Sequence, residues 1–355
     1  MKLAVLGLSI TSSWGNGHAT TYRGLLREMA QRGHDVVFFE RDAPWYSANR
    51  DLPEPPYCRT ILYTSLDHLF AEHGKEIREA DCVIVGSYVP EGIEAGHWIT
   101  RHAKGLTAFY DIDTPVTLAK LERDDCDYLD LELIPRYRLY LSFTGGPTLR
   151  FIEEHYGSPG ARPLYCSVDP SVHRPSGETH SWDLGYLGTY SSDRQPTLDR
   201  LLNEPAATWK EGRFIVAGPQ YPGTIRWPDN VKRVEHLAPV HHGEFYTGQR
   251  YTLNVTRKQM VKAGFSPSVR LFEAAACAVP VISDRWEGID TFFNPGEEIL
   301  LASDSGEVLR ILQGLPENER REIGERARRR VLLSHTAAKR AEELETYITE
   351  AMGAA

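Results

Sequence analysis

The stretch SPSVRLFEAAACAVPVISD, residues 266–284, carries the strongest local signal in this sequence. Ser266 is a favourable helix N-cap and Pro267 suits the first helical position, so the pattern predicts a helix that begins here. The apolar run VPVISD at 279–284 then reads as a buried strand. A helix that leads into a fully apolar strand is typical of an α/β protein with a parallel sheet.

Two polar side chains, Arg270 and Glu273, interrupt this apolar helix. Residues three apart share one face of a helix, and the neighbouring residues are too apolar for that face to be solvated. The N–H groups at the helix start favour an anion such as phosphate. A buried carboxylate needs a partner, for which a sugar diol is one candidate. A structural salt bridge between Arg270 and Glu273 is the alternative interpretation.

Apolar runs alternate with amphipathic segments along the whole chain, which predicts parallel sheets covered by helices on both faces. The expected strands are residues 2–10, 35–40, 59–65, 81–87, 106–112, 139–144, 183–189, 213–219, 251–257, 279–284 and 298–303. Residues 159–182, rich in Pro, Gly and Ser, predict a hinge. We therefore expect two Rossmann-like, doubly wound domains that face a central cleft. Their expected bounds are 1–165 and 166–330, with a C-terminal helix at 331–355 that crosses back toward the first domain.

Bulk properties exclude several classes of function. The net charge of −9 argues against nucleic acid as a partner, and the basic run 320–330 predicts a solvated helix face. No apolar run is long enough to cross a membrane, and residues 2–10 fit a buried strand better than a signal peptide. Five scattered cysteines without a C-x-x-C pair predict a reducing, cytoplasmic location. No feature indicates an oligomeric state.

The stretch GFSPSVRLFEAAACAVPVISD, residues 264–284, resembles the nucleotide-sugar-binding signature of group-1 glycosyltransferases with the GT-B fold. Its form R-x-x-E-A-A-A-C resembles most closely the branch related to the spore maturation protein CgeB. Three further stretches resemble family segments in the expected order. These are CSVDPSVHRP (166–175) at the start of the second domain, LGYLGTYSSDRQPTLDRLL (184–202) around the donor diphosphate, and VKRVEHLAPVHHGEFY (231–246) around the nucleotide base.

The resemblance implies a set of donor-binding residues. Glu273 would bind the ribose hydroxyls, and Arg270 would neutralise the diphosphate or orient Glu273. Lys258 would add positive charge near the leaving group, and we see no clustered Asp/His metal set in this domain, so no metal site is predicted. The expected donor-binding residues are Thr189, Tyr190, Arg194, His236, Leu237, Ala238, Lys262, Ser266, Ser268, Arg270 and Glu273.

One position departs from the family pattern. The family has a second Glu eight residues before the ribose-binding one, where it contacts the transferred sugar. Here that position is Phe265, or lies near Ala263 if the loop is longer. Expectations about the sugar and about the stereochemical outcome are weaker for this reason.

The stretch SITSSWGNGHATTYRGLL, residues 9–26, is a Gly-rich turn that leads into a helix. It matches the dinucleotide fingerprint poorly, because Thr20 stands where Gly or Ala is required, although Glu40 ends the second strand where a ribose-binding acid would lie. The resemblance implies instead that this loop lines the cleft. The residues concerned are Gly15, Asn16, Gly17 and His18.

The stretch FYDIDTPVT, residues 109–117, places Asp111 and Asp113 at the end of a buried strand. We expect at most one of the two to face the cleft. Inverting transfer needs a general base beside the acceptor hydroxyl, and Asp113 or His18 could supply it. The alternative is that Asp113 caps the helix that begins at Pro115. Four other histidines are expected to be structural or exposed: His97, His102, His241 and His242.

These patterns together predict a metal-independent cytoplasmic glycosyltransferase of the hexosyltransferase type. It would move a sugar from a UDP- or TDP-linked donor to an unidentified acceptor hydroxyl, with no cofactor besides this co-substrate. A nucleotide-sugar epimerase, an NAD-dependent oxidoreductase and a catalytically silent sugar-nucleotide-binding protein are the alternatives.

Overall fold

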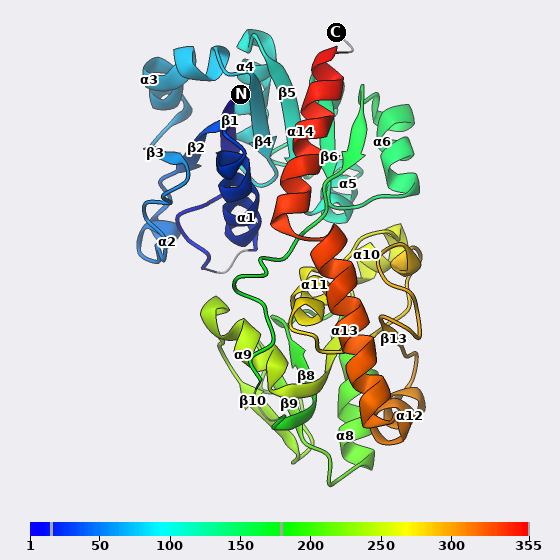
Figure 1. Cartoon of the computed structure of the whole chain (residues 1–355). Helices are drawn as coiled ribbons and strands as arrows, with labels where there is room; N and C mark the ends of the chain where they lie inside the picture. Colours follow the sequence, from blue (N-terminus) through cyan, green and yellow to red (C-terminus); the bar gives the residue numbers. More distant parts are fainter. Residues whose placement is uncertain (15–16, 178–179, 354–355) are drawn as a thin grey trace. The chain divides into compact units, whose positions relative to one another are not determined.

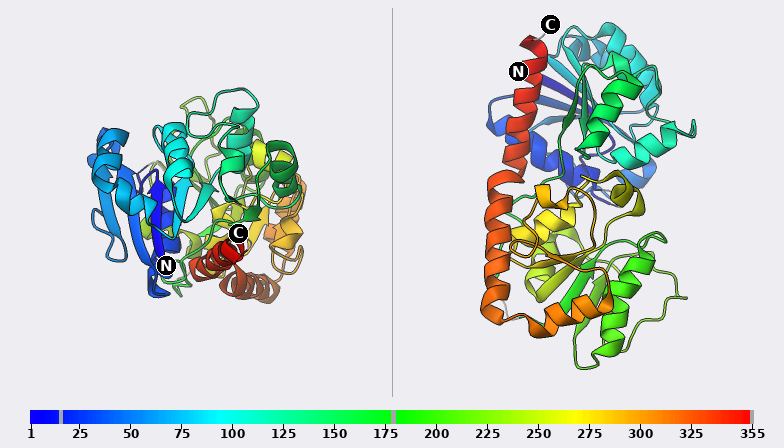
Figure 2. Two further views of the ribbon diagram at one scale, coloured as in Figure 1. Left: turned by 90° about the horizontal axis from the view of Figure 1, so that it is seen from above. Right: turned by 90° about the vertical axis from the view of Figure 1, so that its right-hand side faces the viewer.

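The computed structural model describes residues 1–14, 17–177 and 180–353. The chain separates into two compact units, which are residues 1–166 with 337–355, and residues 167–336. Each unit contains one parallel sheet, of seven strands in the first and six in the second. Helices cover both faces of each sheet (Figure 1 and Figure 2). The prediction of two Rossmann-like α/β domains is therefore confirmed.

The first unit has the strand order β3-β2-β1-β4-β5-β6-β7. Its strands are β1 (Lys2–Gly7), β2 (Asp35–Arg41), β3 (Arg59–Tyr63), β4 (Cys82–Gly86), β5 (Leu106–Asp111), β6 (Leu139–Ser142) and β7 (Ala161–Pro163). Its helices are α1 (His18–Gln31), α2 (Pro44–Ser47), α3 (Leu66–Arg78), α4 (Gly92–His102), α5 (Thr114–Leu121), α6 (Pro147–Tyr156) and α14 (Ala337–Gly353).

Alternate residues of β1 enter two separate cores, because successive side chains of a strand point to opposite faces of the sheet. Leu3 and Val5 pack in a cluster with apolar residues of α1 and α14. Ala4 and Leu6 pack in a second cluster with residues of α3, α4, α5 and α6. Burial on both faces is the reason why a central strand such as β4 is apolar throughout, whereas the edge strand β3 is partly exposed.

The second unit has the strand order β10-β9-β8-β11-β12-β13. Its strands are β8 (Trp182–Leu187), β9 (Phe214–Ala217), β10 (Val231–Val234), β11 (Gln249–Asn254), β12 (Val281–Ser283) and β13 (Leu300–Leu301). Its α-helices are α7 (Gln195–Leu198), α8 (Glu204–Thr208), α9 (His242–Thr247), α10 (Lys258–Ala263), α11 (Val269–Ala276), α12 (Ser305–Gly314) and α13 (Glu317–Ser334).

Three local predictions differ from the structure. The short strands β7 and β10 are not among the predicted ones; both lie at a sheet edge, where a strand needs less apolar sequence. The predicted hinge at 159–182 includes β7. The helix after Gly264 begins at Val269 and not at Ser266, because the chain stays extended through its N-cap residue, Ser268. Proline therefore precedes the helix here and does not occupy its first turn.

The charged C-terminal tail forms two helices, α13 and α14, with His335 and Thr336 between them. α13 belongs to the second unit, and α14 belongs to the first. α14 buries Ala341, Leu344 and Ile348 in the core that it shares with α1. Glu345 on its outer side forms an ion pair with Arg32. The last helix of the chain thus helps to cover one face of the first sheet.

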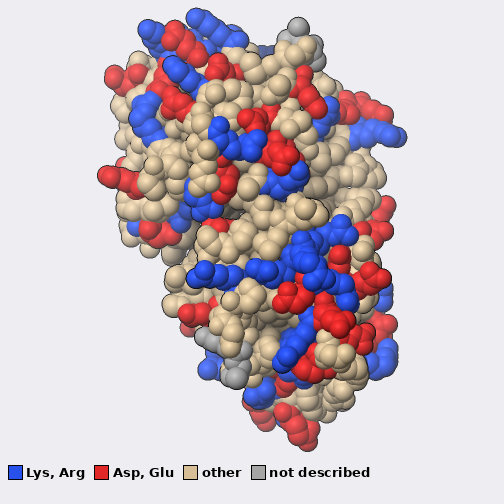
Figure 3. Space-filling view, in the orientation of Figure 1, with Lys and Arg blue, Asp and Glu red and all other residues tan. Residues whose placement is uncertain are grey.

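The surface carries charges of both signs. On the face shown in Figure 3, Lys and Arg side chains are interspersed with Asp and Glu. The basic run on α13 has acidic neighbours too, since Arg326 pairs with Glu322 and Arg330 pairs with Glu298. No helix within the described residues combines the length and apolarity that a membrane span requires.

Candidate functional site

The candidate site of the second unit lies where the strand order reverses. β8 is followed in the sheet by β9 on one side and by β11 on the other. In open parallel sheets, ligands bind at such a switch point, beyond the carboxyl ends of the strands. Leu187 ends β8 and Asn254 ends β11, so polar groups near these two residues mark the site.

Arg270 occupies this switch point and is only 8% exposed. Its Nε donates to the Leu187 carbonyl, and its Nη1 donates to Asn254 Oδ1 at 3.0 Å and to Ser268 Oγ at 3.3 Å. The guanidinium lies over the Tyr186 ring, 4.9 Å from its centroid. Among the described residues no ion pair joins Arg270 to Glu273, so the salt-bridge interpretation of this pair is wrong.

The loop after β8 follows the carboxyl edge of the sheet. The Gly188 amide donates to the Ala217 carbonyl at 2.9 Å, and the Tyr190 amide donates to the Pro219 carbonyl at 3.0 Å. Arg194 reaches back to the carbonyl of Thr189, where its Nη2 donates at 2.6 Å. Thr189, Tyr190 and Arg194 therefore lie close together in the segment that follows β8.

Arg194 is part of a group of cations. Its Nε is buried and has no hydrogen-bond partner in the described part of the chain. Burial lowers the pKa of Arg194, and the nearby positive charges of Arg270 and Arg257 lower it further. Positive charges that lie close together and away from solvent repel one another, and a bound anion relieves this repulsion. Sequence reasoning missed Arg257, although its place just after a buried strand was a usable signal.

Glu273 is 7% exposed and lies in the middle of α11. Tyr246 on α9 donates its hydroxyl proton to Glu273 Oε2 at 2.9 Å, while Oε1 lies 3.7 Å from Nε2 of His173. One carboxylate oxygen is thus held by a hydroxyl and the other faces an imidazole. Of the two serines predicted nearby, Ser266 is buried and Ser268 contacts Arg270.

The remaining predicted donor-binding residues lie in two segments that are exposed or half-buried. His236, Leu237 and Ala238 follow β10, where His236 is exposed and the Ala238 carbonyl accepts from the His241 amide at 2.9 Å. Lys258 and Lys262 are exposed on α10. The Lys258 amide donates to Asp193 at 2.9 Å, which links α10 to the loop that carries Arg194.

Three side chains of the second unit form a group that could hold a metal ion. His173, His242 and Glu273 offer one ligand atom each, and these atoms all lie within 4.8 Å of one another. Sequence reasoning found no such group in this domain, because it considered only residues that lie close together in the sequence. His242, expected to be structural or exposed, is half-buried and belongs to this group. The three residues lie far apart in sequence, so spacing could not reveal them.

The strand order of the first unit reverses between β1 and β4. Three predicted or neighbouring side chains meet there. The rings of His18 and Tyr88 make an edge-to-face contact with centroids 5.4 Å apart. The Tyr88 hydroxyl donates to Asp113 Oδ2 at 3.2 Å. His18 and Asp113, predicted from separate stretches, are thus connected through Tyr88, which sequence reasoning missed.

Burial determines the protonation of His18. The residue is 9% exposed and its Nδ1 has no hydrogen-bond partner in the described part of the chain. Desolvation lowers the pKa of His18 to about 4, so the imidazole is neutral at pH 7. Asp113 stands at the N-cap position of α5, but its side chain makes no capping hydrogen bond. The carboxylate is held by Tyr88 instead.

Asp111 lies inside the first unit and has a structural role. It is fully buried and accepts hydrogen bonds from the Tyr140 hydroxyl at 2.5 Å and the Thr117 hydroxyl at 2.7 Å. Burial raises the pKa of Asp111 to about 6. Only Asp113 of the two carboxylates is partly exposed, which agrees with the expectation that at most one serves a ligand.

The loop after β1 is held by Glu40 at the end of β2. This buried carboxylate accepts from the amides of Ile10 at 2.7 Å and Thr11 at 3.0 Å, and from the Thr11 hydroxyl at 2.6 Å. Glu40 is therefore occupied and does not match a ribose-binding acid. Gly17 is exposed and precedes α1. The other two loop residues predicted to line a cleft, Gly15 and Asn16, lie outside the described residues.

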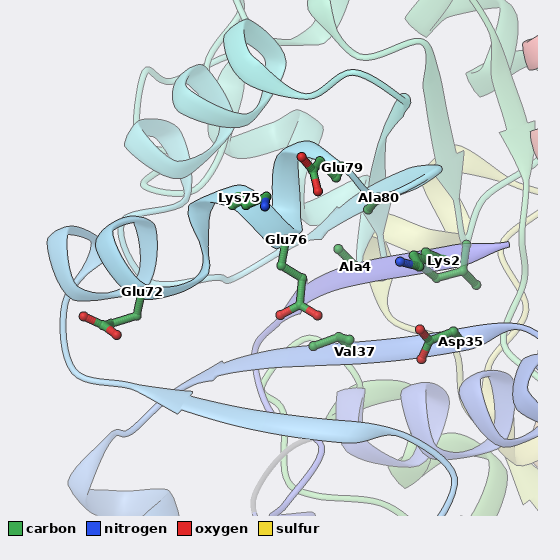
Figure 4. A pocket seen from close by; sticks show the side chains of 10 residues that line it. Lys2, Ala4, Asp35, Val37, Glu72, Lys75, Glu76, Glu79 and Ala80 are labelled. Carbon is green, nitrogen blue, oxygen red and sulfur yellow. The ribbon is translucent and has the colours of Figure 1, made fainter.

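A separate hollow of about 340 Å³ lies at the other end of the first sheet. Figure 4 shows that it is bordered by α3 and by the starts of β1 and β2. Its lining mixes Lys2 and Lys75 with Asp35, Glu76 and Glu79. Because it lies at the amino ends of the strands, it is not the ligand-binding edge of an α/β sheet.

A comparison with known protein families finds one match. Residues 194–346 match the family described as "Glycosyl transferase-like". This segment includes Arg194, Arg257, Arg270 and Glu273. No curated protein sequence matches the chain.

Solved structures resemble the chain over its whole length. Sucrose-phosphate synthase from Thermosynechococcus elongatus has 16% sequence identity and a TM-score of 0.70, with 100% of both chains covered. Anabaena HepE in complex with UDP and glucose has 12% identity and a TM-score of 0.71, with 99% and 100% covered. The E. coli trehalose-6-phosphate protein bound with UDP-2-fluoro glucose has 10% identity and a TM-score of 0.67, with 99% of each chain covered. At these identities the likeness shows the fold, which is GT-B.

Proposed function

We propose that this GT-B protein is a metal-independent glycosyltransferase that moves a hexose-type sugar from a nucleotide-diphosphate donor to an acceptor hydroxyl. The observation that carries the proposal is the group of arginines at the carboxyl edge of the second sheet, inside the segment that matches a glycosyltransferase family. Sugar transfer releases a nucleoside diphosphate, and fixed guanidinium groups in a sheltered site stabilise the charge that develops on it.

The contacts of the second unit support specific roles in donor binding. Arg194 and Arg270 would hold the diphosphate, with the backbone of Thr189 and Tyr190 beside it. Glu273 would accept hydrogen bonds from the ribose hydroxyls, since Tyr246 occupies only part of its acceptor capacity. The expected base-lining residues are His236, Leu237 and Ala238, and Lys262 and Ser268 complete the predicted set.

The first unit supports a role in acceptor activation. Asp113 would act as general base for an inverting transfer, with Tyr88 orienting its carboxylate. His18 is too weakly basic for this role at a pKa of about 4, so it would instead bind the acceptor through its neutral ring. Gly15, Asn16 and Gly17 would line the acceptor side of the same loop.

Finer assignments belong to the same proposal. UDP is the first donor nucleotide to test, because Anabaena HepE, which has a similar fold, was solved in complex with UDP. TDP is the second nucleotide to test. The sequence R-x-x-E-A-A-A-C around Glu273 supports the CgeB-like branch. A cytoplasmic location fits the five cysteines, between which no disulfide forms in the described chain.

A thermal-shift panel with UDP, GDP, TDP, ADP and NAD tests the proposal. A ligand that binds the folded state raises the melting temperature by mass action. We expect one nucleoside diphosphate to stabilise the wild type, and Glu273→Gln to lose most of that response. The control is Glu244→Gln, an exposed carboxylate on α9 that should respond like the wild type.

Three results would contradict or redirect the proposal. Stabilisation by NAD alone, or by none of the nucleotides, would remove the basis for sugar transfer. Interconversion of the nucleotide sugar without release of nucleoside diphosphate would indicate an epimerase. Tight donor binding without any release, even with a broad acceptor panel, would indicate a silent sugar-nucleotide-binding protein.

A further inference from the structure

Three elements of the second unit converge on the cluster formed by His173, His242 and Glu273. His173 lies in the turn before β8, where its amide donates to the Asp169 carbonyl at 2.9 Å. His242 begins α9, and Glu273 lies on α11. All three side chains belong to one compact unit, so their geometry depends only on how that unit folds.

The state of His173 is the feature that needs an explanation. The residue is only 6% exposed, yet neither ring nitrogen has a hydrogen-bond partner in the described part of the chain. Its Nε2 faces Glu273 Oε1 at 3.7 Å, which is too long for a hydrogen bond. A buried polar side chain without partners is uncommon, and a bound ligand absent from the structure is one of its ordinary causes.

We propose that His173, His242 and Glu273 bind a divalent transition-metal ion such as Zn²⁺ through two imidazole nitrogens and one carboxylate oxygen. Imidazole nitrogens suit zinc-like ions better than Mg²⁺ or Ca²⁺, which prefer oxygen ligands. Two atoms bound to one zinc ion at about 2.1 Å each lie no more than about 4.2 Å apart. The ligand atoms here lie within 4.8 Å of one another, so small side-chain rotations bring them into range.

The surroundings of the cluster resemble the outer shell of a metal site. Tyr246, one helical turn after His242 on α9, donates to the second oxygen of Glu273 at 2.9 Å. His242 is half-buried at the start of the same helix. Metal-binding histidines and carboxylates are typically oriented by such second hydrogen bonds. Three protein ligands leave one coordination position open for water or another ligand.

The metal ion would compete with the nucleotide, a consequence that rests on the proposed function. Glu273 is the residue that we assign to the ribose, and a metal ion on Oε1 together with the Tyr246 hydroxyl on Oε2 would occupy both of its oxygens. Zn²⁺ would thus act as an inhibitor that excludes the donor. This agrees with a transfer reaction in which arginines, and not a metal ion, stabilise the leaving diphosphate.

The first experiment measures metal binding without nucleotide. The full chain is treated with a chelator, dialysed and titrated with Zn²⁺ by calorimetry, and with Co²⁺ followed by visible absorption. We expect one ion per chain, and an affinity at least about tenfold lower in His173→Phe and in His242→Ala, because each variant removes one of three ligands. His173→Phe keeps an aromatic ring of similar size, and its melting curve with chelator checks the fold.

The matched control is His241→Ala. His241 neighbours His242 but is exposed and pairs with Glu244 at 3.1 Å, so its removal should leave metal affinity within about twofold of the wild type. The proposal is overturned if the wild type has no saturable site, or if both His173→Phe and His242→Ala bind Zn²⁺ as the wild type does. Loss of binding in His241→Ala alone would assign the ion to exposed histidines and also overturn it.

The second experiment separates this inference from the proposed function. UDP affinity is measured without Zn²⁺ and at the lowest Zn²⁺ concentration that saturates the wild type, and we expect at least a tenfold loss in the wild type and a clearly smaller loss in His173→Phe. Zn²⁺ binding without UDP binding would leave the metal site standing and remove the nucleotide role. UDP binding that Zn²⁺ does not affect would reject competition, and UDP binding without any Zn²⁺ site would reject the metal proposal alone.

Discussion

In both units the strand order reverses once, between β1 and β4 in the first and between β8 and β11 in the second. The side chains at the two reversal points differ in charge. The first holds a neutral imidazole, a tyrosine and a carboxylate, namely His18, Tyr88 and Asp113. The second holds Arg270 together with Arg194 and Arg257. One topology therefore provides two edges, one suited to moving a proton and one suited to binding an anion.

This difference shows that the fold determines where a ligand binds, while a few side chains determine which kind of ligand binds there. Parallel strands bring their carboxyl ends to one edge in both units. The side chains that the following loops and helices bring to each edge then determine its charge. If the comparison is correct, changes at the second edge alter nucleotide affinity, and changes at the first edge alter turnover.

The largest effect is expected from Arg270→Gln. The change removes a buried guanidinium that donates to Leu187 and Asn254, and hydrogen bonds to charged groups are strong enough for a loss of about a hundredfold in UDP affinity. Calorimetry measures it. Arg321→Ala, at an exposed arginine of α13, is the control. Equal UDP affinity in Arg270→Gln and the wild type would break the comparison.

Asp113→Asn should affect turnover and not affinity. The amide keeps a hydrogen-bond acceptor for Tyr88 but cannot take up a proton, so we expect release of nucleoside diphosphate to slow about a hundredfold. UDP affinity should stay within about twofold, because Asp113 lies in the other unit. Asp127→Asn, at a largely exposed carboxylate, controls for the loss of charge. A parallel loss of UDP affinity would contradict the division of roles.

His18→Gln should change the pH dependence of stability. The pKa of His18 is lowered to about 4 in the folded protein, below its ordinary value, so the unfolded chain takes up a proton first as the pH falls. The free energy of unfolding of the wild type should therefore fall by about 2 kcal/mol more than that of the variant between pH 7 and pH 5. Urea unfolding at the two pH values measures this. Identical pH dependence in both proteins would show that His18 is not buried.

The smallest effect is expected from a pair of glycine variants, one at each edge. A Cβ at Gly188 would lie 2.7 Å from the Tyr186 hydroxyl and 2.9 Å from Arg270 Nη2, whereas a Cβ at Gly17 would meet nothing within 4 Å. Gly188→Ala should displace Arg270 and weaken UDP binding about tenfold, in line with other overpacked sites. Gly17→Ala should bind UDP as the wild type does. The reverse ranking would mean that the nucleotide contacts the first edge.

Local patterns predicted most of the fold because they report burial. Strands such as β4 and β9 are apolar along their whole length. Such a run between helical segments is typical of a strand buried on both faces of a sheet. The strands that escaped prediction, β7 and β10, are three and four residues long and lie at sheet edges. There burial is partial, so the sequence constraint is weak.

The sequence predicted which helix carries Arg270 and Glu273 better than it predicted their hydrogen-bond partners. Arg270 and Glu273 share a helix, and their spacing suggested that they could contact each other. Yet the polar groups at the ends of β8 and β11 hold Arg270, while Tyr246 of α9 holds Glu273. The choice among several nearby acceptors depends on strand order and helix packing, neither of which the spacing of two residues contains.

The sequence by itself determined two doubly wound domains, the loop that carries Arg194 and the helix that carries Arg270 and Glu273, because periodicity and burial are properties of short segments. Only the tertiary structure decided that Tyr88 connects His18 to Asp113, and that His173 and His242 meet at Glu273. These residues come from separate turns, strands and helices. Their meeting depends on the order of the strands and on which helices pack together, which are properties of the whole unit.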